Sequence, residues 1–180
     1  QMPSVPYYGR LTNHPGIGYL SVTSFTDKTA QEVKEALEAL KGGDELQGLI
    51  LDLRGNGGGL LDAAVALVGY FVPKGTEVVR TRGRGVMDEK VYKTTVSPIL
   101  PDTPLAVLVD GGTASSSEIT SGALQDLDRA VILGSRSFGK GLVQSTRQLP
   151  YDGLLKLTIA KYYIPSGRLV QAIDYSRRNA

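Results

Sequence analysis

Apolar residues along the chain recur with two periods, that of strands and that of helices. Residues 16–22 alternate between apolar and polar side chains, which is typical of a half-buried strand. Residues 46–53 and 105–109 are short, largely apolar runs, which indicate strands buried on both faces. Residues 29–41 and 60–71 carry apolar side chains at helical spacing on one face. Strands that alternate with helices are typical of an α/β domain.

Local signals complete this pattern. Thr29 and Glu32 have the spacing of a capping box at the start of the first helix, and Gly42–Gly43 ends that helix. Residues 1–9 contain two prolines and are interpreted as a lead-in segment. The other predicted elements are a hairpin, a helix and three strands, at residues 77–82 with 90–96, about 116–127, 130–133, 142–149 and 154–164. Residues 1–180 are predicted to form one domain.

The composition is that of an ordinary globular protein. The 180 residues are 41% hydrophobic and 21% charged, which argues against disordered and fibrous classes. The formal net charge of +2 is small for a nucleic-acid-binding domain, and the basic cluster Arg80–Arg84 is interpreted as a solvated hairpin. Cysteine is absent, which excludes disulfides, thiolate metal sites and a cysteine nucleophile.

The sequence contains no apolar run of the roughly 18 residues that a membrane-spanning helix needs, and no signal peptide at its start. It begins at Gln1 without a methionine and ends in a short polar segment. Both ends are interpreted as those of a fragment of a larger polypeptide.

A glycine-rich loop, Arg54–Gly59, joins a predicted strand to a predicted helix. Backbone N–H groups at such a position lie at the positive end of a helix and favour an anion. The loop matches neither G-x-x-x-x-G-K-[ST] nor G-x-G-x-x-G, so nucleotide binding is disfavoured. Two interpretations stay open: a turn that needs positive φ, and an oxyanion hole made of backbone amides.

Ser115 precedes a predicted helix and has two candidate roles. Ser115 and Glu118 have the spacing of a capping box, so the serine can be a helix N-cap. The same position puts its hydroxyl beside free amides such as that of Ser116, which would stabilise an oxyanion formed when the hydroxyl attacks a carbonyl. Capping by the Glu118 carboxylate would leave Ser115 available as a nucleophile.

A serine nucleophile needs a base, and Lys140 is the best candidate in the sequence. It lies between two glycines, after Phe138 and before an apolar strand, where burial would lower its pKa towards neutrality. Gln144, four residues on, faces the same side of an extended segment and is placed to orient the lysine. The competing interpretation is a surface lysine in a glycine turn. The single histidine, His14, lies in a predicted turn and is disfavoured as a base.

Three segments taken together resemble one protein family. They read D-L-R-G-N-G-G-G-L from Asp52, V-D-G-G-T-A-S-S-S-E-I-T-S-G-A-L-Q-D from Val109, and G-K-G-L-V-Q from Gly139. In this order they resemble the carboxyl-terminal processing (tail-specific) serine proteases, from Gly16 to about Ile173. The resemblance implies a serine–lysine dyad and an oxyanion hole. The implied roles are nucleophile for Ser115, general base for Lys140, orienting residue for Gln144, and oxyanion-hole amides for Gly58 or Gly59 and for Ser116.

The resemblance also implies a fold, an activity and a setting. The fold would be a crotonase/Clp-protease-like α/β core of β-β-α units, with a mixed sheet packed by helices. The activity would be that of a serine endopeptidase that cleaves proteins near their C-termini without a cofactor or a metal. Protein or peptide substrates, not nucleic acid, would bind as an extended strand at a sheet edge near residues 154–164. The location would be the bacterial cell envelope or periplasm, and a homo-oligomer is compatible with the family.

Two departures from the family pattern bear on these expectations. Ser116 stands where the family commonly has alanine, which places a second hydroxyl beside the expected nucleophile. Nothing in the chain resembles the family's PDZ domain, which captures substrates and is expected elsewhere in the parent chain, so the chain alone is expected to be weakly active or inactive. Two alternatives stay open. One is a non-catalytic peptide-binding module, and the other is acyl-CoA chemistry with a carboxylate near the glycine loop, for which Asp62 is the candidate.

Overall fold

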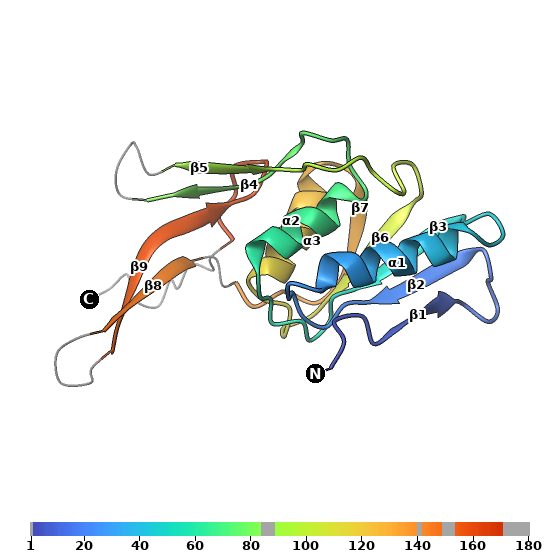
Figure 1. Ribbon diagram of the computed structural model, residues 1–180, viewed down its shortest axis with the longest axis horizontal. Coiled ribbons are helices and arrows are strands. Elements are labelled where there is room, and N and C mark those ends of the chain that lie inside the picture. Colours follow the sequence, from blue (N-terminus) through green and yellow to red (C-terminus); the bar gives the residue numbers. More distant parts are fainter. Residues whose placement is uncertain (1, 84–88, 140–141, 149–153, 171–180) are drawn as a thin grey trace.

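The computed structural model describes residues 2–83, 89–139, 142–148 and 154–170, and for 142–148 and 154–160 the backbone alone. Within these ranges the chain forms three helices and nine strands (Figure 1). In chain order they are β1 (Tyr7–Arg10), β2 (Ile17–Ser21), α1 (Thr29–Lys41), β3 (Gly48–Asp52), α2 (Leu61–Gly69), β4 (Glu77–Arg82), β5 (Lys90–Lys93), β6 (Leu105–Val109), α3 (Ser116–Asp126), β7 (Ala130–Gly134), β8 (Leu142–Gln148) and β9 (Leu154–Tyr163). None of the helices in these ranges is long and apolar enough to cross a membrane.

The first sheet has the strand order β1-β2-β3-β6-β7. β1 is antiparallel to β2, and β2, β3, β6 and β7 are parallel to one another. Leu20, Leu51 and Val107 lie in one row across the three central strands, and each is fully buried. Their side chains belong to one core cluster with the apolar faces of α1, α2 and α3. The predicted mixed sheet packed by helices is therefore confirmed.

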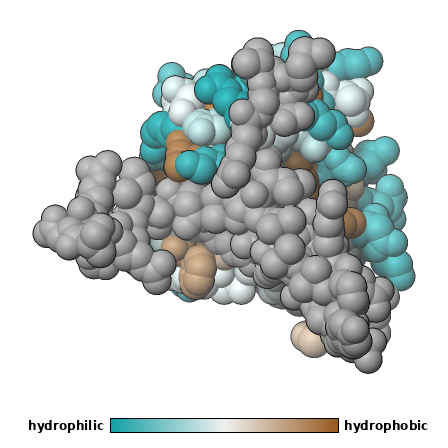
Figure 2. All heavy atoms as spheres, turned by 90° about the vertical axis from the view of Figure 1, so that its left-hand side faces the viewer, coloured by the Kyte–Doolittle hydropathy of each residue, from teal (hydrophilic) through white to brown (hydrophobic). Residues whose placement is uncertain are grey.

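A second sheet, with the order β5-β4-β9-β8, extends from the body of the molecule (Figure 1). The predicted hairpin of β4 and β5 is confirmed, and β4 also pairs with β9 through Arg80–Arg82 and Lys161–Tyr163. The pairing of β4 with β9 was not predicted from the sequence, because the two strands are about eighty residues apart. Seen from this end, the described residues are mostly hydrophilic, and apolar ones form only small separate spots (Figure 2).

The amino-terminal segment differs from its prediction. Residues 7–9, interpreted as the end of a lead-in segment, form β1 together with Arg10 at the edge of the first sheet. The predicted capping box of α1 is wrong, because the N-cap residue is Lys28 and makes no side-chain cap. The Glu32 carboxylate instead accepts a hydrogen bond from the Ser4 N–H at 3.1 Å, and the Thr29 hydroxyl donates to Ser4 Oγ at 2.8 Å. Both side chains therefore anchor the segment that leads into β1.

The Arg129 side chain connects three segments of the chain through hydrogen bonds. Its guanidinium donates hydrogen bonds of 2.7 Å to the carbonyls of Phe71, Leu100 and Thr103, which lie in three different segments. Burial lowers the pKa of this guanidinium, which stays charged because arginine is a very strong base. Three carbonyls thus depend on one side chain for a donor.

We expect Arg129→Lys to lower the free energy of unfolding by about 2 kcal/mol, because a single ammonium cannot reach all three carbonyls and leaves buried acceptors unpaired. Urea denaturation monitored by circular dichroism measures the effect. The control is Arg136→Lys, whose side chain is exposed, and a change of less than about 0.5 kcal/mol is expected there. Equal stabilities of the two variants would contradict the prediction.

Candidate active site

The parallel neighbours β3 and β6 end at the same edge of the sheet, and the turns that follow them are joined by hydrogen bonds. Asp110 Oδ1 accepts hydrogen bonds from the N–H groups of Gly55 and Gly112, each at 2.9 Å. The buried Thr113 hydroxyl donates to the Leu53 carbonyl at 2.8 Å. The glycine loop after β3 and the serine turn after β6 therefore form one rigid unit.

Asn56 is the central residue of this unit, and its side chain is fully buried. Its Nδ2 donates to the Val22 carbonyl at 2.9 Å, and its Oδ1 accepts from the Gly58 N–H at 2.8 Å. Its backbone carbonyl accepts from the Ala114 N–H at 3.0 Å. This residue was not predicted from the sequence. The available signal was a single amide side chain within a run of glycines.

The glycines of the loop allow it to approach the serine turn closely. Gly58 has φ +98°, and a Cβ atom there would lie 2.8 Å from the Ser115 Cβ. Gly59 has φ +143°, and a Cβ atom there would lie 2.0 Å from the Phe25 carbonyl oxygen. Other residues cannot adopt these conformations without strain. Contact between the loop backbone and Ser115 thus requires glycine.

The backbone amides expected in an oxyanion hole differ in their hydrogen bonding. The Gly58 N–H is donated to Asn56. The N–H groups of Gly59 and Ser116 have no acceptor among the described residues. Ser116 is the first residue of α3, where amides have no partner within the helix and the helix dipole is positive. One amide of the glycine loop and one amide of the serine turn can therefore bind a developing negative charge.

Ser115 has a backbone conformation unlike that of an ordinary N-cap. It has φ +56° and ψ −120°, whereas N-cap residues are usually extended. The other described non-glycine residue with positive φ, Asp128, follows the C-cap of α3, where left-handed residues are common. Such a conformation is costly for serine and is found where function requires it. The Ser115 side chain is half-buried at the surface of the unit.

Glu118 links Ser115 to the segment that precedes Lys140. Its Oε2 accepts a hydrogen bond from the Ser115 N–H at 3.0 Å, and the Ser115 side chain faces the Glu118 N–H, so the predicted capping box is present. The Gly139 N–H is donated to Glu118 Oε1, and the Phe138 N–H donates to the Thr113 carbonyl at 2.9 Å. The chain therefore reaches the serine turn one residue before Lys140.

Lys140 itself lies outside the described residues, and so does the side chain of Gln144. The Gln144 backbone is part of β8 and pairs with Thr158 of β9. Their predicted roles as base and orienting residue stay predictions.

Ser116 and Ser117 are both buried in the first turn of α3, but their hydroxyls differ. The Ser116 hydroxyl donates to the Gly59 carbonyl at 2.8 Å, and only 2% of the residue is exposed. The Ser117 hydroxyl has no hydrogen-bond partner in the part of the chain that the structure describes. Neither is positioned like Ser115, which lies at the surface of the unit.

Arg54 at the start of the glycine loop is bound to a carboxylate of the protein itself. Its Nε and Nη2 donate to the two oxygens of Asp52 at 3.0 and 2.8 Å, and the Tyr19 hydroxyl donates to Asp52 at 2.5 Å. Burial opposes ionisation of Asp52, but the hydrogen bonds from Arg54 and Tyr19 outweigh it and hold the pKa of the carboxyl below its usual value. This arginine therefore fixes the end of β3 and does not offer a free cation to a phosphate.

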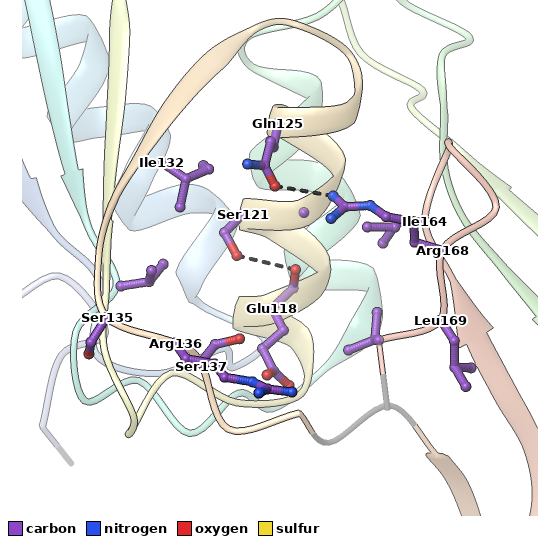
Figure 3. A pocket seen from close by; sticks show the side chains of 13 residues that line it. Glu118, Ser121, Gln125, Ile132, Ser135, Arg136, Ser137, Ile164, Arg168 and Leu169 are labelled. Carbon is purple, nitrogen blue, oxygen red and sulfur yellow. Dashed lines mark hydrogen bonds between the residues drawn. The ribbon is translucent and has the colours of Figure 1, made fainter. Parts of the chain in front are cut away.

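A cavity of about 340 Å³ lies along α3 beside the serine turn. Figure 3 shows Glu118, Ser121 and Gln125 of α3 on its wall, and the Arg168 side chain reaching Gln125 Oε1 at 3.1 Å. Ile132 and Ile164 add apolar surface. Since Glu118 also binds the Ser115 amide, the cavity begins one helical turn from the serine.

Two other candidate residues lie away from this unit. His14 is exposed and precedes β2, so it lies at the edge of the sheet opposite to the carboxyl ends of the strands. Asp62 is exposed on the first turn of α2. Among the residues that the structure describes, no group of three or more His, Asp or Glu side chains is arranged to hold a metal ion.

Comparison with known proteins identifies the family. The sequence profile of Peptidase family S41 matches residues 16–175. The chain belongs to peptidase family S41. S41 enzymes are serine peptidases, so the resemblance predicted from the three motifs is confirmed.

Two curated relatives and one solved structure are similar to this S41 chain. It is 45% identical over 160 residues to a carboxy-terminal-processing protease of Bartonella bacilliformis, covering 87% of this chain and 37% of that protein. It is 40% identical to carboxyl-terminal-processing peptidase 2, chloroplastic, of Arabidopsis thaliana, covering 88% and 30%. The structure of a photosystem II D1 C-terminal processing protease has a TM-score of 0.81 at 32% identity, covering 95% and 46%. The S41 chain thus spans about a third of the length of these two relatives.

The link through Asp110 should make stability depend on pH. The hydrogen bond from the Gly55 N–H lowers the pKa of the Asp110 carboxyl. Burial raises this pKa and the hydrogen bond from the Gly112 N–H lowers it, so the pKa lies below its usual value. A carboxyl with a lowered pKa in the folded state stabilises the protein above its unfolded pKa of about 4, and this contribution is lost as the pH falls through the folded pKa. Asp110→Asn keeps an acceptor oxygen but removes the charge.

We therefore expect Asp110→Asn to be less stable than the wild type at pH 7, and the difference to shrink as the pH falls below about 4. Urea midpoints measured from pH 3 to pH 7 test this expectation. Asp62→Asn, at an exposed carboxylate on α2, is the control for the removal of one surface charge. A stability difference that stays constant over this range would contradict the role of the charge.

Proposed function

We propose that this chain is the catalytic core of a serine endopeptidase that cleaves proteins near their C-termini, with Ser115 as the nucleophile. The observation that carries the proposal is the backbone of Ser115, which has φ +56° at the N-terminus of α3 and lies against the glycine loop. N-cap residues are usually extended, whereas the conformation of Ser115 is of the costly kind that is found where function requires it.

The reaction follows from the groups around Ser115. The Ser115 Oγ attacks the carbonyl carbon of the scissile peptide bond, and its proton passes to the neutral amine of Lys140. The resulting oxyanion accepts hydrogen bonds from the N–H groups of Gly59 and Ser116. Collapse breaks the C–N bond, the leaving amine takes the proton from Lys140, and water then hydrolyses the acyl-enzyme with Lys140 again as base.

The assignment of Lys140 is supported by its neighbours in the chain. Gly139 is held by the carboxylate that also holds the Ser115 amide, so the next residue starts close to the nucleophile. A lysine acts as a base near neutral pH when burial disfavours its ammonium form. Gln144 would then orient the amine, as the family resemblance implies.

The substrate is proposed to bind as an added strand. The stretch expected to offer the edge, residues 154–164, forms β9, which pairs at Lys161 with both β4 and β8. β8 is the last strand of this sheet among the described strands, and it starts two residues after Lys140. We therefore favour the outer edge of β8, where main-chain pairing would deliver a peptide to Ser115. The cavity along α3 would take a side chain next to the scissile bond.

Substrate capture is proposed to depend on parts of the protein beyond this chain. The chain spans 37% and 30% of the two curated relatives. A PDZ domain in the parent polypeptide would bind the substrate's C-terminus, and the bacterial cell envelope would be the location, as the family resemblance implies. The chain by itself is then weakly active or inactive.

A non-catalytic peptide-binding module is the second candidate. It would need only the outer edge of β8. It does not account for the conformation of Ser115, or for two amides that have no acceptor within the described ranges. Acyl-CoA chemistry would need a carboxylate at the glycine loop, and Asp62 is exposed to solvent on α2.

We expect Ser115→Ala and Lys140→Ala each to lower kcat for cleavage of an unstructured protein by about 10³-fold or more, because each removes one member of a unit. Cleavage by the natural polypeptide that contains this chain, followed by gel electrophoresis and mass spectrometry, measures the effect. The matched control is Ser117→Ala, which removes a buried hydroxyl that has no partner among the described residues. Wild-type turnover in either active-site variant would show that the dyad is wrongly assigned.

A further inference from the structure

Ser116 contacts the glycine loop through its side chain, and its backbone N–H is one of the two proposed donors of the oxyanion hole. Its hydroxyl donates to the Gly59 carbonyl at 2.8 Å. Its N–H has no acceptor among the described residues, and neither has the N–H of Gly59. One residue therefore supplies one of the two amides and binds the residue that supplies the other.

The glycine loop is held on its opposite side by Phe25. The Phe25 N–H donates to the Gly58 carbonyl at 3.0 Å, and the Leu60 N–H donates to the Phe25 carbonyl at 2.9 Å. The Gly59 carbonyl is not part of this pairing and is bound by Ser116. This carbonyl belongs to the last of three consecutive glycines, residues 57–59, and glycine has more backbone freedom than any other residue. Without the Ser116 hydroxyl, the Gly59 carbonyl would lose its hydrogen bond to α3, and the loop at Gly59 would be paired only with Phe25.

We propose that the Ser116 hydroxyl is a positioning group that sets the geometry between the Gly59 and Ser116 amides of the oxyanion hole. This inference rests on the proposed protease function. Oxyanion stabilisation requires donors fixed before the reaction, because amides that must reorient lose much of their effect. Displacements of about 0.5 Å are enough to weaken such a site. The hydroxyl acts through the loop and does not touch the substrate.

The other hydroxyls of α3 show that this contact is not a general feature of the helix. The Thr120 hydroxyl donates to the Ser116 carbonyl and the Ser121 hydroxyl to the Glu118 carbonyl, both within α3. The Ser117 hydroxyl has no partner in the described part of the chain. Among these four described hydroxyls, that of Ser116 alone reaches another segment. A serine in place of the alanine that is common in the family thus has a specific use here.

The test compares Ser116→Ala with Ser117→Ala in the natural polypeptide that contains this chain. Both changes remove one buried hydroxyl from the first turn of α3, and only the first removes a bond to the loop. We expect Ser116→Ala to lower kcat about tenfold with KM unchanged, which is less than the loss for deleting an oxyanion donor outright. Binding of a peptide aldehyde, which forms a tetrahedral adduct with the serine, should weaken by a similar factor. Ser117→Ala should change neither quantity.

Rates are normalised to the folded fraction, measured by urea denaturation under the assay conditions, so that a loss of stability is not read as a loss of catalysis. Unchanged kcat in Ser116→Ala would overturn the inference, and so would a lower kcat/KM caused by a raised KM alone. A similar loss of kcat in Ser117→Ala would also overturn it. Activity in Ser115→Ala would overturn the proposed function itself. An inactive Ser115→Ala with a fully active Ser116→Ala would overturn only the role of Ser116.

Discussion

The joining of two turns at the carboxyl ends of β3 and β6 is the interaction on which the site depends. The two strands are parallel neighbours, so the loops that follow them meet at one edge of the sheet. Four hydrogen bonds then connect the loops: Gly55 to Asp110, Thr113 to Leu53, Ala114 to Asn56, and Ser116 to Gly59. Three of these bonds, all except that of Ser116 to Gly59, involve no residue of the proposed catalytic machinery. The unit is thus built largely from residues whose task is to hold backbone.

This unit explains how Ser115 can keep a conformation that is unfavourable for serine. A non-glycine residue in such a region costs about 1–3 kcal/mol. Each hydrogen bond between the loops contributes about 1 kcal/mol, and buried partners cost more when they are left unpaired. The four bonds are therefore sufficient to offset the strain. The contact between Gly58 and Ser115 adds a steric limit, since a side chain at Gly58 would force the two turns apart.

The sequence predicts the elements of this protein better than the contacts between them. Helix α3 and strands β3 and β6 follow from local periodicity, and Ser115 follows from its place before a helix together with the family motifs. β1 was not predicted, because its four residues are stabilised by pairing with β2 and not by a pattern of their own. Asn56 was missed for a similar reason, since its partners Val22 and Ala114 are distant in the sequence. The Thr29–Glu32 capping box failed because Ser4 binds both side chains.

The site combines groups that are fixed in different ways. Ser115 and the amides of Gly59 and Ser116 belong to the unit on the first sheet. In the sequence, Lys140 stands between Gly139, whose N–H is bound by Glu118, and β8, the outer strand of the second sheet among the described strands, which starts at Leu142. In the proposed mechanism, the base belongs to the segment that leads into the second sheet, whereas the two amides belong to the unit on the first sheet. Proton transfer and oxyanion stabilisation would then depend on different parts of the fold.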